Sequence, residues 1–251
     1  MDTKQIRFLE KTASDGYMPL ETMDYDGWRL GFTQGFTGRA NSVLLFEPST
    51  IGTEEKVAFC EKTYEAHGLP CIFKLTEADE ELRSYLQKRG YKEAKPTDVM
   101  ILPLGGLKTE DILSAGWDEV RCSEDPADWF PYYFAFEKME DQTKQDLTRE
   151  IHAKVAVEKV FIKVFYEGRV AAVASLAISN GYSLLHNVVV DEALRGIGLG
   201  EKLCRAAIRK SAECGAGYSF LQVMEDNPVA INLYQKLGFE KQYTYRYVKQ
   251  A

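Results

Sequence analysis

A glycine-rich turn constrains the fold of this 251-residue chain more than any other feature of its sequence. Residues 194–202 have the sequence LRGIGLGEK, follow the apolar run 184–190 and begin a helical stripe of Leu199, Leu203 and Ala207. This pattern predicts a strand, a tight turn and a helix in succession. Alternating glycines let a ligand approach the backbone, and the first N–H groups of a helix lack partners within the helix. The turn is therefore suited to hold a phosphate or pyrophosphate.

The spacing of the glycines distinguishes between known phosphate-binding loops. Dinucleotide-binding turns follow Gly-x-Gly-x-x-Gly, but Glu201 stands where the third glycine is required. Nucleoside-triphosphate loops follow Gly-x-x-x-x-Gly-Lys-Ser/Thr, which residues 196–202 do not match. Arg195, Gly198 and Gly200 do fit Arg/Gln-x-x-Gly-x-Gly, which resembles the acyl-CoA pyrophosphate loop of the GCN5-related N-acetyltransferases (GNAT family). If residues 195–200 are considered alone, they could also form an ordinary glycine-rich turn that binds no ligand.

A second motif downstream resembles the same family. Residues 227–239, with the sequence NPVAINLYQKLGF, match the family's closing signature Asn-x-x-Ala-x-x-Leu-Tyr-x-x-x-Gly-Phe at every fixed position. They follow a short strand pattern at 219–223, as the resemblance requires. Two motifs in this order, with a helix and a strand between them, imply the α+β fold of the family. We therefore expect mixed, mostly antiparallel sheets flanked by helices.

Composition argues against several other functions. The net charge of −7 disfavours sequence-independent binding of DNA or RNA, which needs a basic face. The longest apolar stretch, 170–178, is too short to span a bilayer, and the N-terminus has no charged-then-apolar leader. We expect a soluble, cytoplasmic protein that binds neither nucleic acid nor membrane. The oligomeric state is left open, a homodimer included.

Cysteine and histidine are too dispersed to indicate a disulfide framework or a metal site. The cysteines are odd in number and form no Cys-x-x-Cys pair, which predicts reduced residues, most of them in the core. The histidines are scattered as well, so we expect no zinc site. The residues concerned are Cys60, Cys71, Cys122, Cys204, Cys214, His67, His152 and His186.

Hydrophobic periodicity and turn residues predict elements along the whole chain. The first half is expected to contain strands at 28–32, 42–46, 71–75 and 99–102 and helices at 53–67 and 79–88, and residues 1–25 could contain a first helix. The second half is expected to begin at 119–122 and to contain strands at 160–166, 169–178 and 182–190 and helices at 126–138 and 142–152, followed by the helices and strand of the two motifs.

The two halves match at the ends of their helices, which indicates an internal repeat. Residues 55–57 open a helix as 201–203 do, and residues 87–91 parallel 235–239. We therefore expect two tandem acyl-CoA N-acyltransferase-like units. A chance match of helix ends is the alternative.

The predicted boundary divides a first domain, 1–107, from a catalytic domain, 108–251, with the linker near Gly105-Gly106 and 108–111. The first unit has residues 48–53 in place of the glycine turn and Leu86 in place of Tyr234. The first unit thus lacks both the glycine-rich turn that would bind phosphate and the tyrosine hydroxyl. We expect this degenerate unit to supply substrate contacts or an interface instead of binding acyl-CoA.

Two groups of residues are candidates for an acceptor site. Arg39, Asn41 and Ser42 could bind an acidic part of an acceptor, although a turn rich in such residues needs no function. An aromatic cluster in the predicted helix 126–138 could line a pocket, although aromatic residues at helical spacing more often form core. This cluster consists of Trp129, Phe130, Tyr132, Tyr133, Phe134 and Phe136.

The resemblance also implies where acyl-CoA binds. In the family, it lies between the strand before the loop and the strand after the next helix, with its pantetheine on strand backbone and its pyrophosphate on the loop. Arg195 either adds charge or braces the loop, and Asn227 either contacts the pantetheine arm or caps the helix that begins at Pro228. The implied binding residues are Val188, Val189, Val190, Arg195, Gly196, Ile197, Gly198, Leu199, Gly200, Asn227 and Tyr234.

Acetyl transfer from a thioester to an amine requires three kinds of group. A backbone N–H at the end of the strand 188–190 could stabilise the charge that develops on the carbonyl oxygen. The resemblance implies that Tyr234 protonates the leaving thiolate, with a packed core aromatic as the alternative. His186 and Glu225 are candidates to take the amine proton, and each also has a purely structural alternative.

We therefore expect an N-acetyltransferase that moves the acetyl group of acetyl-CoA to a primary amine of a small-molecule or peptide acceptor, by direct attack in a ternary complex. No cysteine lies in a motif that would form an acyl-enzyme. Two alternatives stay open: a non-catalytic acyl-CoA-binding or regulatory protein, and transfer of a longer acyl chain.

Overall fold

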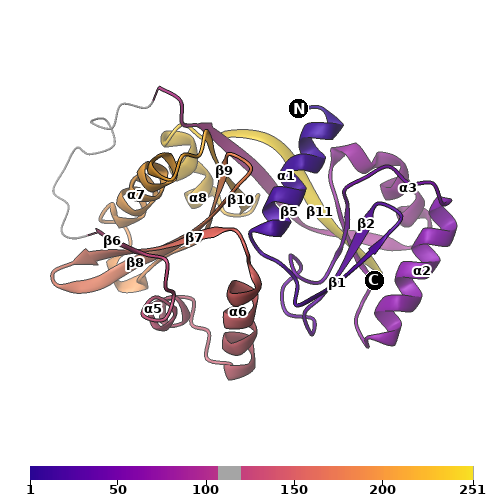
Figure 1. The fold of residues 1–251 in the computed structure, drawn as a ribbon, viewed down its shortest axis with the longest axis horizontal. Helices are drawn as coiled ribbons and strands as arrows, with labels where there is room; N and C mark the ends of the chain where they lie inside the picture. Colours follow the sequence, from indigo (N-terminus) through magenta and orange to yellow (C-terminus); the bar gives the residue numbers. More distant parts are fainter. Residues whose placement is uncertain (107–119, 251) are drawn as a thin grey trace.

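The computed structural model describes residues 1–106 and 120–250, and a similar series of elements occurs twice within them (Figure 1). The first series is α1 (Thr3–Asp15), β1 (Glu21–Tyr25), β2 (Trp28–Phe32), β3 (Val43–Leu45), α2 (Thr53–Ala66), β4 (Ile72–Leu75), α3 (Glu80–Lys88) and β5 (Tyr91–Pro103). The second is α6 (Gln142–Lys154), β7 (Glu158–Tyr166), β8 (Arg169–Ser179), β9 (Tyr182–Val190), α7 (Leu199–Glu213), β10 (Tyr218–Met224), α8 (Pro228–Lys236) and β11 (Glu240–Gln250). The second series is preceded by β6 (Val120–Ser123) and α5 (Phe130–Phe136).

All strands of the described residues join one 11-stranded sheet, in the order β1-β2-β3-β4-β11-β5-β10-β9-β8-β7-β6. The pairs β3–β4 and β9–β10 are parallel, and the other neighbouring strands are antiparallel. The mixed, mostly antiparallel sheet expected from the sequence is confirmed. The predicted boundary at 107/108 lies outside the described residues.

The last strand of each series pairs with the other series. β11 lies between β4 and β5, and β5 lies between β11 and β10. The β5–β11 pair is antiparallel, with Ile101 opposite Glu240 and Tyr91 opposite Gln250. Each half therefore relies on a strand of the other half to cover an edge of its sheet.

Helices cover both faces of this sheet (Figure 1). In the second half, α7 packs on one face through Leu203, and α5 packs on the other face next to the buried Trp129. In the first half, α2 packs on the sheet through Val57. The N-terminal helix α1 lies over the central strands, where Leu9 joins a core cluster with residues of β5, β10 and β11. Among the described residues, every helix is too short or too polar to cross a membrane.

The predicted elements agree with the structure apart from a few omissions. The sequence patterns do not predict β1, which is mostly exposed, or β11, and they include only a third of the long strand β5. Cys122 is exposed on the edge strand β6, whereas Cys60 and Cys204 are buried as expected. The expected linker at 108–111 lies outside the described residues.

A carboxylate of the protein itself binds to the turn before α2. The Asp26 carboxylate accepts hydrogen bonds from the N–H groups of Thr50 and Ile51, each at 2.9 Å, and its oxygen lies 3.2 Å from Lys56 Nζ. These hydrogen bonds, above all the one from Ile51, hold the pKa of Asp26 far below its ordinary range. A carboxylate of the protein thus takes the place that a bound anion would occupy before this helix.

We predict that Asp26→Asn destabilises the protein at neutral pH and much less in acid. The native pKa of Asp26 lies below the ordinary value of 3.8, so its contribution is present above that value and is lost as the pH falls below it towards the native pKa. Thermal unfolding of wild type and variant should therefore converge between about pH 5 and pH 2. Asp24→Asn, on the exposed side of the same hairpin, is the matched control and should have a smaller effect. A gap between wild type and Asp26→Asn that stays constant with pH would contradict this role.

Candidate functional site

The strands β9 and β10 separate soon after they begin. Their parallel pairing is limited to residues 182–184 of β9 and 218–220 of β10. Farther along, β10 continues beside β5 as far as Met224, while β9 continues beside β8 as far as Val190. The edge of β9 beyond Leu184 is therefore not paired with β10. Its backbone N–H and C=O groups can bind an extended ligand.

A bulge changes the direction of the backbone in the middle of this edge. Ala174 of β8 faces two residues of β9, Asn187 and Val188. Asn187 has a φ of +54°, in the left-handed region. Its side-chain amide donates to Ser175 Oγ at 3.0 Å, and its oxygen accepts from the Tyr133 hydroxyl at 3.4 Å. These contacts from β8 and α5 hold the bulge in place.

The glycine-rich turn follows the same edge and is open to solvent. Gly196 and Gly198 have φ values of +85° and +88°, which glycine adopts without steric cost. Ile197 between them is 53% exposed. The N–H of Lys202 bonds to the carbonyl of Gly198, so the N–H groups of residues 199–201 come before the first intrahelical bond. This turn can therefore receive an external anion, in contrast to the turn that Asp26 fills.

A cavity of about 550 Å³ lies beside the open edge. Its walls come from β9, β10, α5, α8 and β11 of the second half and from β5 and the β2–β3 loop of the first half. A volume of this size is typical of sites for small molecules. Both halves of the chain thus build one site.

Tyr234 and Asn227 place the closing motif in the wall of this cavity. Tyr234 is 8% exposed, and its ring packs edge-on against Phe239 with the centroids 5.9 Å apart. Burial raises the pKa of the Tyr234 phenol, which therefore keeps its proton at neutral pH. Asn227 Oδ1 accepts from the Ala230 N–H at 3.1 Å, so it caps α8 while it also lines the cavity. Both roles considered for Asn227 are compatible with this position.

His186 lines the cavity, with His152 beside it. The two rings have their centroids 5.9 Å apart, and both side chains are buried. Burial is the main cause that lowers the pKa of His152 to about 4 and the pKa of His186 well below its ordinary value. Both rings are therefore neutral at neutral pH. His186 Nδ1 has no hydrogen-bond partner among the described residues.

His152 and His186 are far apart in the sequence, so their contact could not be predicted from it. The part of the chain that the structure describes contains no group of three or more His, Cys, Asp or Glu residues able to hold a metal ion.

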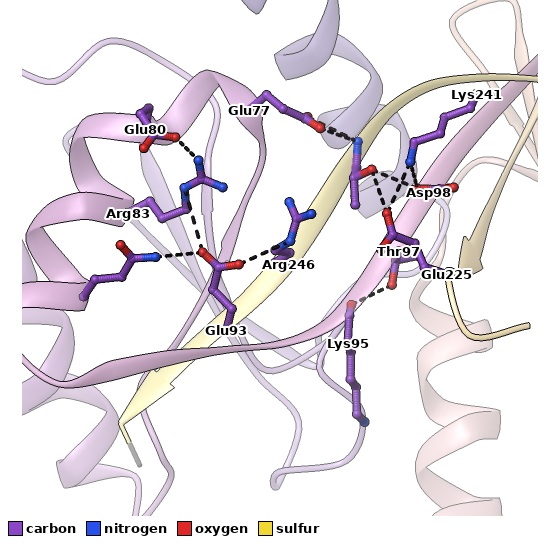
Figure 2. Close-up of polar contacts among 12 residues, drawn as sticks. Glu77, Glu80, Arg83, Glu93, Lys95, Thr97, Asp98, Glu225, Lys241 and Arg246 are labelled. Atoms are coloured by element: carbon purple, nitrogen blue, oxygen red, sulfur yellow. Dashed lines mark hydrogen bonds and ion pairs between the residues drawn. The ribbon is translucent and has the colours of Figure 1, made fainter.

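Glu225 does not line the cavity, in contrast to its neighbours Met224 and Asp226. Figure 2 shows the polar contacts that its side chain makes instead. Its carboxylate accepts from Lys241 Nζ at 3.2 Å and from the Thr244 hydroxyl at 3.4 Å. The same lysine lies 2.6 Å from Asp98, so these residues form a polar cluster over β5 and β11. The contacts of Glu225 do not favour a role as the base. Glu137, which directly follows α5 and which the sequence patterns do not single out, does line the cavity, and burial raises its pKa.

The three valines expected to contact pantetheine face different surroundings. Val188 lines the cavity. Val189 is buried against the aromatic residues of α5, so its side chain turns away from the cavity. Val190 packs partly against the core under α7, which Leu199 also enters. Contacts between Val189 and a ligand are therefore restricted to its backbone.

The six predicted aromatic residues and the polar loop residues also divide between cavity and core. Tyr133 lines the cavity, whereas Trp129, Phe130 and Phe134 are buried core residues, as the structural alternative expected. The others are the partly buried Phe136 and the exposed Tyr132. In the β2–β3 loop, Arg39 lines the cavity, whereas Asn41 and Ser42 are buried.

Known proteins share this architecture. The structure of a GCN5-related N-acetyltransferase from Kribbella flavida matches with a TM-score of 0.72 and 16% identity, over 97% of this chain and 95% of that chain. A tandem GNAT protein from the clavulanic acid biosynthesis pathway matches with a TM-score of 0.66 and 15% identity, over 82% and 72% of the two chains. In sequence, the chain is 26% identical over 235 residues to the uncharacterized N-acetyltransferase YobR of Bacillus subtilis, over 93% of this chain and 94% of that protein.

The fold and these relatives define a GNAT-type N-acetyltransferase, as the two sequence motifs imply. Within that class, the chain belongs to the family described as "Probable histone acetyltransferase Rv0428c C-terminal", which it matches over residues 3–248.

We predict that Gly198→Ala destabilises the protein more than Gly200→Ala does. Alanine at position 198 would have to keep a φ near +88°, at a cost of about 1–2 kcal/mol, or shift the turn. A Cβ on Gly200 would lie 3.5 Å from Leu233 Cδ2 and 3.7 Å from Val190 Cγ2, which are ordinary contacts, and alanine suits a helix. Thermal unfolding of the two variants measures the difference. Equal melting temperatures would show that the backbone of Gly198 is not constrained as described.

Proposed function

We propose that the protein transfers the acetyl group of acetyl-CoA to a primary amine by direct attack within a ternary complex. The observation that carries this proposal is the unpaired edge of β9, which runs along a cavity lined by Tyr234 and leads to the exposed glycine turn. The free N–H groups at the start of α7 would hold the pyrophosphate, and Arg195 would add a positive charge beside it. Backbone groups of 188–190 would bind the pantetheine arm.

In the reaction, the amine nitrogen attacks the thioester carbonyl carbon, the C–S bond breaks, and an amide bond forms. A backbone N–H near the bulge at Val188 would stabilise the charge on the carbonyl oxygen. Tyr234 would donate its proton to the leaving thiolate, since burial keeps the phenol protonated until then. The free Nδ1 of the neutral His186 would accept the proton that the amine loses. Because its pKa is low, it would soon pass this proton to solvent.

We further propose that the first half is a degenerate copy that does not bind acyl-CoA. Asp26 fills the turn before α2, and Leu86, which is fully buried in α3, takes the place of Tyr234. This half would instead complete the acceptor site with Arg39, Lys95 and Thr97. The description of the family names a histone as the acceptor of another protein. The cavity walled by both halves here favours a small molecule or a single side chain of a peptide.

We predict that Tyr234→Phe lowers kcat by about 100-fold, the range typical of losing a general acid, while acetyl-CoA affinity changes little. Phenylalanine keeps the ring that packs on Phe239 and removes the hydroxyl. Release of free CoA with a panel of amines measures turnover, and calorimetry measures acetyl-CoA binding. Tyr85→Phe, in α3 of the first half, is the control and should behave as wild type.

Two other results would change the proposal. Full activity of Tyr234→Phe would remove this residue from the mechanism and leave acyl transfer in place. Binding of acetyl-CoA without release of CoA for any amine would favour a non-catalytic binding protein.

A further inference from the structure

An arginine in the cavity wall has no acidic partner in the part of the chain that the structure describes. Arg39 lies in the loop between β2 and β3 and lines the cavity, with its guanidinium carbon 4.2 Å from the ring centroid of Tyr17. Within residues 1–106 and 120–250, no carboxylate lies within ion-pair distance of it. By contrast, Arg29 of the same half and Arg246 of β11 do pair with carboxylates. A partly buried charge without a counterion carries a desolvation cost that a bound anion would offset.

The loop is built so that Arg39 stays in this position. Asn41 is 3% exposed and holds the two sides of the loop together, because its oxygen accepts from the Thr33 N–H at 2.7 Å and its amide donates to the Phe36 carbonyl at 2.6 Å. At Gly38 a Cβ would lie 2.8 Å from Tyr247 Cζ, so the backbone passes directly over that ring. The corresponding strands of the second half, β8 and β9, are joined by a short turn instead. The longer loop therefore supplies a cation that a simple hairpin would not.

Further polar atoms without partners lie in the same cavity wall. Gln222 of β10 has a buried Nε2 with no hydrogen-bond partner among the described residues, and the same is true of His186 Nδ1. The Tyr17 ring links the two regions, because it stacks under Arg39 and meets His186 edge-on with the centroids 6.3 Å apart. The buried Gln222 Nε2 is a donor without an acceptor, which is costly, so this part of the wall is suited to a ligand that brings an acceptor atom.

The acidic residues of the cavity do not neutralise Arg39. Glu137, directly after α5, and Asp226, in the turn before α8, line the cavity. The charge of Arg39 opposes the rise that burial causes in the pKa of Glu137, but Glu137 is not within ion-pair distance of the guanidinium. The wall formed by Arg39 and Gln222 therefore presents donors and a positive charge.

We propose that the acceptor carries a carboxylate as well as its primary amine, and that Arg39 and Gln222 bind this carboxylate. This inference rests on the proposed transfer of acetyl from acetyl-CoA. The fork of a guanidinium matches the two oxygens of a carboxylate, and the Gln222 amide adds a third donor. The amine near His186 forms the amide bond as the C–S bond breaks, the nitrogen loses one proton, and the sulfur gains one. The acceptors are thus amino acids or similar amino-carboxylates, and the products are the N-acetylated acid and free CoA.

The test compares matched acceptors on the wild-type protein. The probes are the common L-amino acids, β-alanine and 4-aminobutyrate, each beside its amide, with O-phosphoethanolamine as a differently charged amine. CoA release gives kcat/KM for each. We expect at least one acid to exceed its amide by about tenfold or more, as a charge-assisted hydrogen bond to a carboxylate provides.

Variants of Arg39 then test whether this residue causes the preference for acids over amides. Arg39→Gln should raise the KM of the preferred acid by about tenfold or more and leave kcat/KM for its amide within about threefold. Arg39→Lys, which keeps the charge without the fork, should fall between wild type and Arg39→Gln. Arg209→Gln, on the exposed face of α7, loses the same charge far from the cavity wall and should keep the wild-type preference.

The possible results separate this inference from the proposed function. CoA release with equal rates for acids and amides, or an unchanged preference in Arg39→Gln, overturns the carboxylate site and leaves acetyl transfer in place. A preference for O-phosphoethanolamine over every acid also overturns it. Absence of CoA release with every amine removes the proposed function together with this inference. If Arg39→Gln does not fold, the wild-type comparison of acids with amides decides.

Discussion

The early end of the parallel pairing between β9 and β10 is the constraint on which the site depends. After residues 182–184 of β9, each strand follows a different neighbour: β9 stays with β8, and β10 stays with β5. Because β5 belongs to the first half of the chain, the partner that holds β10 away from β9 comes from outside the second half. The open edge is therefore linked to the exchange of last strands between the halves. The same sheet thus joins the two halves through β5 and β11 and separates β9 from β10 beside the cavity.

The two halves use the turn before the corresponding helix in opposite ways. Before α2, the N–H groups of Thr50 and Ile51 bond to the Asp26 carboxylate of the same half. Before α7, two glycines with positive φ leave the corresponding turn exposed and without such a carboxylate among the described residues. The N–H groups of the turn before the helix need an acceptor in either case. In the first half the protein supplies the acceptor, and in the second half the proposed coenzyme does.

The sequence predicts the parts of the site that depend on local pattern. The glycine turn, α7, α8 and the positions of Tyr234 and Asn227 follow from short motifs whose geometry is set by neighbouring residues. The pairing of β5 with β11 joins residues far apart in the sequence, and local periodicity carries no information about such partners. The same reason explains why Arg39 and His152 come close to His186 without any sequence signal. The place of Glu225 directly after β10 makes it a candidate base, but the sequence does not show that Lys241 and Thr244 of β11 bind its carboxylate.

A structure of the protein with CoA bound tests the central claim most directly. The account predicts that the diphosphate lies at hydrogen-bond distance, about 3 Å, from the backbone N–H groups of 196–201, with the pantetheine along the unpaired edge of β9. A diphosphate bound at the turn before α2, or away from both helix termini, would contradict the account.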